Sequence, residues 1–162
     1  MIDAAILRDA EALLAACRAR GLRIATAESC TGGLIAAALT AIPGSSDIVD
    51  RGFVTYSNEA KTEMLGVPAA TIAAEGAVSE QVARAMAEGA LVRARAELAV
   101  AVTGIAGPGG GSAAKPVGLV WFGLAHAHAT ARTLRKVFPG DRQEIRRATV
   151  AEAIALLSAL LV

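Results

Sequence analysis

The feature that most constrains the fold of this 162-residue sequence is the alternation of short apolar runs with longer segments of helical periodicity. Strand-like and helix-like segments alternate through the first two thirds of the chain, and two strand-like segments then precede a last helix. This order predicts a mixed β-sheet covered by helices on both faces. We therefore expect an α/β fold, a three-layer α/β/α sandwich, formed by a single domain over residues 1–162.

Capping residues and glycines place the individual elements. Asp141, with Glu144 three positions later, is typical of a capping box at the start of a helix. The expected helices span 3–20, 33 to about 42, 57 or 58 to 66, a short turn from 68, 79 to about 96, and 141–161. The expected strands span 22–27, 48–56, 98–102, 117–125 and 130–138.

Composition excludes several classes of function. The net charge of +1 arises from 16 basic and 15 acidic residues spread along the chain, so no basic stripe indicates nucleic acid. Charged residues interrupt every apolar helix, so we expect no membrane span. The N-terminus lacks a signal-like apolar run, and the two cysteines form neither a disulfide framework nor a metal motif. A cytoplasmic location follows as the expectation.

Three polar, glycine-bearing turns follow expected strands, at residues 28–33, 56–61 and 103–112. Ligands of open α/β sheets bind beyond the C-terminal ends of the strands, so these turns are expected to line one cleft. The 103–112 loop matches neither a P-loop, since Gly111 is followed by Ser112 and Ala113, nor a dinucleotide fingerprint, since it leads into a strand. We expect no cofactor.

Lysine is rare in this chain, in which nearly all basic residues are arginine. Lysine occurs only at positions 61, 115 and 136. Lysine can lose its proton when it is desolvated, whereas arginine cannot. A lysine inside a polar motif, such as Lys61, is therefore a candidate base.

Taken together, five segments resemble the CinA C-terminal domain family. They are Thr26–Gly33 (TAESCTGG), Gly52–Lys61 (GFVTYSNEAK), Gly76–Ser79 (GAVS), Thr103–Pro108 (TGIAGP) and Lys115–Gly118 (KPVG). The resemblance runs from about Ala4 to Leu161, with Leu119 where the family frequently has threonine. Stand-alone members of this family include nicotinamide mononucleotide deamidases (nicotinamide-nucleotide amidohydrolases), which convert that nucleotide to nicotinic acid mononucleotide and ammonia during recycling of pyridine nucleotides.

The resemblance implies Ser29 as nucleophile, with Lys61 as its base and Tyr56 nearby. A serine hydroxyl needs a base to become nucleophilic, and burial can lower the pKa of a lysine enough for that role. Tyr56 would orient Lys61 or relay a proton to the departing ammonia. Backbone amides between Cys30 and Gly33 would stabilise the oxyanion.

The resemblance also implies residues that hold the nucleotide. For the phosphate they are Ser46, less favourably Ser45, and Arg142. The remaining substrate-binding candidates are Cys30, Thr31, Gly32, Gly33, Thr103, Gly104, Gly107, Gly109 and Gly110. The expected partner is a small-molecule nucleotide, and alanine-rich helix faces leave a homodimer possible.

Each candidate residue also has a purely structural interpretation. Ser29 is equally placed to cap a helix, Lys61 to lie in solvent, Tyr56 to pack at a strand end and Arg142 to pair with Glu144. Ser46 and Lys115 are explained as turn or loop residues, and Cys30 as a buried thiol. His126 and His128 lack a third metal ligand, so we expect no metal site.

The resemblance also leaves alternative functions open. One is a non-catalytic module that binds nucleotide phosphates or regulates another protein, and the other is hydrolysis of a different amide or nucleotide.

Overall fold

The computed structural model describes residues 2–162 and contains a five-stranded sheet in the order β2-β1-β3-β4-β5. The strands are β1 (Ile24–Glu28), β2 (Val49–Val54), β3 (Leu98–Gly104), β4 (Leu119–His126) and β5 (Arg132–Val137). β1 pairs in parallel with β2 and β3, whereas β4 is antiparallel to both β3 and β5. The sheet is therefore mixed, as the sequence predicts.

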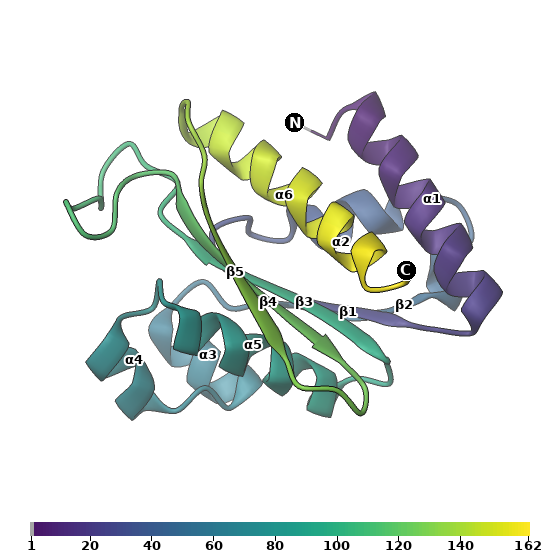
Figure 1. The fold of residues 1–162 in the computed structure, drawn as a ribbon, viewed down its shortest axis with the longest axis horizontal. Coiled ribbons are helices and arrows are strands. Elements are labelled where there is room, and N and C mark those ends of the chain that lie inside the picture. Colours follow the sequence, from purple (N-terminus) through teal and green to yellow (C-terminus); the bar gives the residue numbers. More distant parts are fainter. Residues whose placement is uncertain (1) are drawn as a thin grey trace.

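Helices cover both faces of this sheet (Figure 1). One layer contains α1 (Ala4–Arg20), α2 (Leu34–Thr40) and α6 (Arg142–Ala159), and the other contains α3 (Asn58–Leu65), α4 (Ala69–Glu75) and α5 (Glu80–Arg93). The predicted three-layer α/β/α class is confirmed. Within residues 2–162, no helix combines the length and apolar character needed to cross a bilayer.

Side-chain caps begin most of the helices at the residues expected from the sequence. The side chains of Asp3, Ser57 and Ser79 accept hydrogen bonds from backbone amides in the first turns of α1, α3 and α5. At α6, Asp141 and Glu144 form the predicted capping box, with distances of 2.9 and 2.7 Å. These bonds satisfy amides that a helix N-terminus otherwise leaves without partners.

The two faces of the sheet pack with side chains of different size. On β3, Leu98, Val100 and Val102 belong to the core shared with α1, α2 and α6, whereas Ala99 and Ala101 face the α5 side. The small side chains let α5 approach closely: a Cβ at Gly123 of β4 would lie 2.1 Å from the carbonyl oxygen of Ala83. Burial of the larger face stabilises the fold by about 25 cal/mol per Å² of apolar surface.

Several boundaries differ from those expected. α5 ends at Arg93 because Ala94 is extended and the Arg95 amide donates to the Asp50 carboxylate at 3.0 Å. β4 begins at Leu119 because Gly118 has φ +94°, which breaks the strand expected from Val117. β1 runs from Ile24 to Glu28, two residues later at its start and one at its end than expected. A 3₁₀ turn over Ser45–Asp47 was not expected.

Candidate active site

The three polar turns do meet at the C-terminal ends of the parallel strands. Ser29 follows β1, Thr55 follows β2, and Thr103 lies near the end of β3. The Ser29 amide donates to the Val102 carbonyl at 3.1 Å, and the Thr55 amide donates to the Glu28 carbonyl at 2.9 Å. These backbone bonds extend the sheet pairing beyond β1 and hold the first residues of two turns side by side.

Lys61 and Ser29 form the centre of this site. The Lys61 Nζ donates to the Ser29 Oγ at 3.1 Å and to the Thr55 carbonyl at 2.9 Å, and it lies 3.5 Å from the Ser57 carbonyl. Lys61 is only 1% exposed and Ser29 only 9%. The interpretation of Lys61 as a solvated helix residue is therefore wrong.

The environment of Lys61 favours its neutral form. Burial lowers the pKa of the Lys61 ammonium below its ordinary value of 10.5. Among residues 2–162, the partners of its Nζ are the Ser29 hydroxyl and two backbone carbonyls, and none is a carboxylate. A neutral amine has two hydrogens and one lone pair, so it can donate to both carbonyls while its lone pair faces the Ser29 hydroxyl.

The N-cap residue of α2 is Gly33, and the side chain that accepts from its first-turn amides is that of Glu28, not Ser29. The Glu28 carboxylate is 1% exposed and accepts from the Thr31 hydroxyl and the Ile35 amide, both at 2.7 Å, and from the Ala36 amide at 3.1 Å. The capping interpretation of Ser29 is wrong, because the helix amides are occupied by Glu28. The Ser29 hydroxyl is left for Lys61.

The Cys30 side chain is a buried thiol, in agreement with its structural interpretation. Burial raises its pKa to about 12, so it stays protonated at neutral pH. Its Sγ would lie 3.2 Å from a Cβ at Gly104, which shows how closely β3 approaches the turn that carries Ser29. Cys17 is also a buried free thiol.

Tyr56 and Arg142 contact each other at the surface of the site. The Arg142 Nη2 donates to the Tyr56 hydroxyl at 3.1 Å, and the Nη1 donates to the Gly107 carbonyl at 2.9 Å. Arg142 therefore bonds Tyr56 and Gly107 and does not form an ion pair with Glu144. Tyr56 is 63% exposed, and its hydroxyl bonds Arg142 and not Lys61.

A surface cavity of about 560 Å³ adjoins Arg142. The residues that line it are Ala106, Pro108, Val117, Gly140, Asp141, Arg142 and Gln143. Gly107 lies beside this cavity, because its chain neighbours Ala106 and Pro108 line it.

The other candidate residues of the 103–112 loop differ in their surroundings. A Cβ at Gly109 would have no heavy atom within 4 Å. Gly110 has a left-handed φ of +86°, and the Thr103 hydroxyl donates to the Ala77 carbonyl at 2.8 Å.

Ser45 and Ser46 lie far from the other candidate residues of the same chain. They lie in the 3₁₀ turn before β2, at the N-terminal edge of the sheet, whereas Ser29 lies at the C-terminal edge. Six strand residues separate the two edges, which corresponds to about 20 Å. Ser46 is exposed, while Ser45 is buried.

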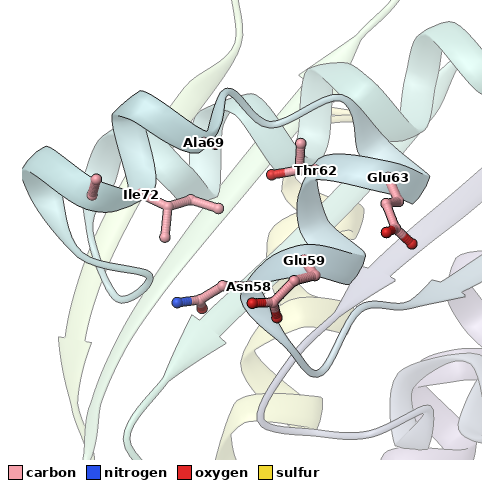
Figure 2. A pocket seen from close by; sticks show the side chains of 7 residues that line it. Asn58, Glu59, Thr62, Glu63, Ala69 and Ile72 are labelled. Carbon is pink, nitrogen blue, oxygen red and sulfur yellow. The ribbon is translucent and has the colours of Figure 1, made fainter.

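A second cavity, of about 420 Å³, lies between α3 and α4, and Figure 2 shows its lining side chains. α3 contributes Asn58, Glu59, Thr62 and Glu63. The buried residues of the same helix are Lys61 and Leu65, so the catalytic candidate lies on a different face. This cavity is not part of the Ser29 site.

The chain matches the model of a known protein family over almost its whole length. The model of the CinA C-terminal domain matches residues 8–161. The chain belongs to the CinA C-terminal domain family.

Known members of the CinA C-terminal domain family match almost the whole chain. This chain is 52% identical to the nicotinamide-nucleotide amidohydrolase PncC of Escherichia coli K12, and the aligned region covers 97% of this chain and 95% of that protein. It is 58% identical to PncC of Enterobacter agglomerans over 82% of this chain and 80% of the relative. A CinA-like protein of Mycolicibacterium gilvum is 55% identical, but this chain spans 36% of its length.

Solved CinA structures share the fold. The competence/damage inducible protein CihA from Agrobacterium tumefaciens superposes with a TM-score of 0.96 at 52% identity, covering 99% of this chain and 98% of that one. A CinA superfamily protein from Klebsiella pneumoniae gives 0.92 at 40% identity, with 96% and 97% covered.

Two charged residues of this CinA domain have structural roles at the site that the sequence analysis missed. In the sequence, Glu28 is one residue of the TAESCTGG motif, and Arg146 belongs to none of the five family segments. Arg146 donates to the Cys30 carbonyl at 3.0 Å and to the Thr31 carbonyl at 3.2 Å. The spacing of Arg146 indicates this role, because Arg142 and Arg146 are four residues apart and therefore share one face of α6.

His126 ends β4 and His128 lies in the turn before β5. Among residues 2–162, no group of three or more His, Cys, Asp or Glu side chains is arranged to hold a metal ion.

Proposed function

We propose that this chain hydrolyses the carboxamide of nicotinamide mononucleotide, with Ser29 as nucleophile and Lys61 as base. The chain is an enzyme of the nicotinamide-nucleotide amidohydrolase type, as its relatives with 52–58% identity are named. The observation that supports the proposed chemistry is the 3.1 Å contact between the Lys61 Nζ and the Ser29 Oγ in a buried setting.

The first half of the reaction forms an acyl-enzyme. Neutral Lys61 takes the hydroxyl proton while the Ser29 Oγ attacks the carboxamide carbon, which gives a tetrahedral oxyanion. Backbone amides of the turn from Cys30 to Gly33 stabilise that charge. As the C–N bond breaks, the Lys61 ammonium returns its proton to the nitrogen, and ammonia leaves.

The second half releases the acid. Lys61, neutral again, takes a proton from water, whose oxygen attacks the ester carbon. Collapse of the second oxyanion breaks the bond to the Ser29 Oγ, which regains its proton. The product is nicotinic acid mononucleotide, and we assign the reaction to the recycling of pyridine nucleotides.

Arg142 is the proposed phosphate ligand. It donates to Gly107 and Tyr56, and its guanidinium fork retains further N–H groups for a phosphate in the adjoining cavity. Tyr56 orients Arg142 in this scheme, and a proton relay to ammonia stays a prediction. The parts assigned to Ser46 and the substrate-lining glycines, the cytoplasmic location and a homodimer also stay predictions from the sequence.

The direct test measures release of ammonia and nicotinic acid mononucleotide from nicotinamide mononucleotide. We expect Ser29→Ala and Lys61→Arg to lose at least about 1,000-fold in kcat, since each removes a member of the dyad. Lys136→Arg is the matched control, because Lys136 pairs with Glu152 at the surface at 3.4 Å and should keep full activity.

The outcomes separate the competing functions. An active Ser29→Ala enzyme would refute the mechanism even if the activity is real. A wild-type protein that binds the nucleotide without releasing ammonia would indicate the non-catalytic binding module. A panel of other amides and nucleotides at equal concentration would reveal a different substrate.

A further inference from the structure

The turn that carries Ser29 is held by an arginine from a distant part of the chain. Arg146, in the second turn of α6, donates through its Nε to the Cys30 carbonyl at 3.0 Å and through its Nη2 to the Thr31 carbonyl at 3.2 Å. The guanidinium also lies against Gly32, where a Cβ would be 3.5 Å from the Nη2. A single planar fork thus fixes two consecutive peptide groups.

The direction of these carbonyls determines the direction of the neighbouring amides. In a planar trans peptide the C=O and N–H point in opposite directions. Since the Cys30 and Thr31 carbonyls point at Arg146, the amides of Thr31 and Gly32 point away from it. The Gly32 amide donates to the Ser29 carbonyl at 3.0 Å, so the side away from Arg146 is the side of Ser29.

Of the two amides that Arg146 orients in this way, those of Thr31 and Gly32, the Thr31 amide is the one left to donate to a ligand. The Gly32 amide is already bonded to the Ser29 carbonyl. The amides of Ile35 and Ala36, in the first turn of α2, are bonded to the Glu28 carboxylate. Within residues 2–162, the Thr31 amide has no hydrogen-bond acceptor. An amide held in place without an acceptor is suited to stabilise a charge that exists only during the reaction.

We infer that Arg146 is a positioning residue, which orients the peptide groups of Cys30 and Thr31 so that the Thr31 amide donates to the oxyanion formed at Ser29. Its positive charge also polarises both peptide groups and makes the Thr31 N–H a stronger donor. This inference rests on the proposed function, since it specifies how the Ser29 reaction is stabilised.

Two variants of Arg146 and one of its neighbour test this role. Arg146→Lys keeps the charge but cannot donate to both carbonyls with a planar fork. Arg146→Ala removes both donors. Arg147→Ala is the matched control, because Arg147 is the next residue of α6 and pairs with Asp3 at the surface, away from the turn.

The first readout is steady-state hydrolysis of nicotinamide mononucleotide. We expect Arg146→Lys and Arg146→Ala to lower kcat by about 10- to 100-fold, somewhat less than the loss of an oxyanion donor itself, with KM changed by less than about threefold. Free guanidinium ion at millimolar concentration should restore part of kcat to Arg146→Ala. A role limited to folding would lower the active fraction and would not produce this rescue.

The second readout does not depend on the substrate. A fluorophosphonate probe labels an activated serine: the Ser29 Oγ forms a bond to phosphorus, fluoride leaves, and Lys61 takes the proton. The phosphoryl oxygen occupies the oxyanion position, so the labelling rate should fall in the Arg146 variants and not in Arg147→Ala. Mass spectrometry of the labelled peptide identifies Ser29 as the site.

The outcomes distinguish this inference from the proposed function. If wild-type protein is labelled at Ser29 but releases no ammonia, the substrate is wrong, and slower labelling of the Arg146 variants still supports the inference. If wild type is active and the Arg146 variants match Arg147→Ala in kcat and labelling rate, the inference is overturned alone. If wild type is neither labelled nor active, both are overturned.

Discussion

The Lys61 Nζ lies 3.1 Å from the Ser29 Oγ, although 32 positions separate the two residues in the sequence. The contact is made because the Ser57 cap begins α3 just after β2, which places Lys61 in the first turns of the helix, facing the end of β1.

The pH dependence of catalysis should report the titration of Lys61. Burial lowers the pKa of Lys61, and only the neutral amine can act as a base. We therefore expect kcat/KM to rise with pH through a midpoint below 10.5 and to level off above that midpoint. Rate measurements from about pH 6 to about pH 10 check this. An acid limb centred at the ordinary lysine value would contradict it.

Stability should depend on pH through the same group. Between the lowered pKa of folded Lys61 and 10.5, the unfolded chain binds more protons at this site than the folded chain. The contribution of Lys61 to the free energy of unfolding therefore increases as pH rises through that window. Lys61→Met lacks the titration, so its stability relative to wild type should fall between neutral and alkaline pH, as measured by urea unfolding. A constant difference would mean that Lys61 titrates normally.

Glu28→Gln should weaken the start of α2. The carboxylate accepts from two helix amides and a hydroxyl, and an amide side chain replaces one acceptor oxygen with a donor. We expect a loss of about 1–3 kcal/mol in the free energy of unfolding, together with lower kcat. Glu63→Gln, on the exposed side of α3, is the control and should change neither quantity.

Gly104→Ala should crowd β3 against the start of β4, next to the Ser29 turn. A Cβ there would lie 2.8 Å from the Leu119 carbonyl oxygen and 2.7 Å from the Val120 Cγ2. Such crowding costs about 1–3 kcal/mol, which thermal unfolding would detect. Gly109→Ala serves as the comparison, since its Cβ would meet nothing within 4 Å. Equal stability of the two variants would show that the backbone shifts freely at Gly104.

The sequence predicted the layers of the fold because the relevant signals are local. Helix caps such as Ser57 and Asp141 and the apolar run of β3 depend on neighbouring residues, and they were located correctly. The end of α5 was missed because a long-range bond between Arg95 and Asp50 decides it. The 3₁₀ turn at Ser45 has no comparable local signature.

The site was less accessible to sequence reasoning. Ser29, Lys61 and Arg142 were selected from motif resemblance, yet their partners include the carbonyls of Thr55, Ser57 and Gly107, and a carbonyl is present at every position. The structure separates Ser46 from them because it fixes which edge of the sheet each turn occupies. Side-chain patterns alone do not contain that information.

The arginines of α6 link the last helix to the earliest turn of the site, with 116 positions between Arg146 and Cys30. These bonds form only after residues beyond 140 have been synthesised and α6 has packed on the sheet. A nascent chain that has already folded β1, β2 and β3 would therefore contain Ser29 and Lys61 without the two Arg146 bonds to the turn. Synthesis of α6 is the step at which such a chain would gain its full activity.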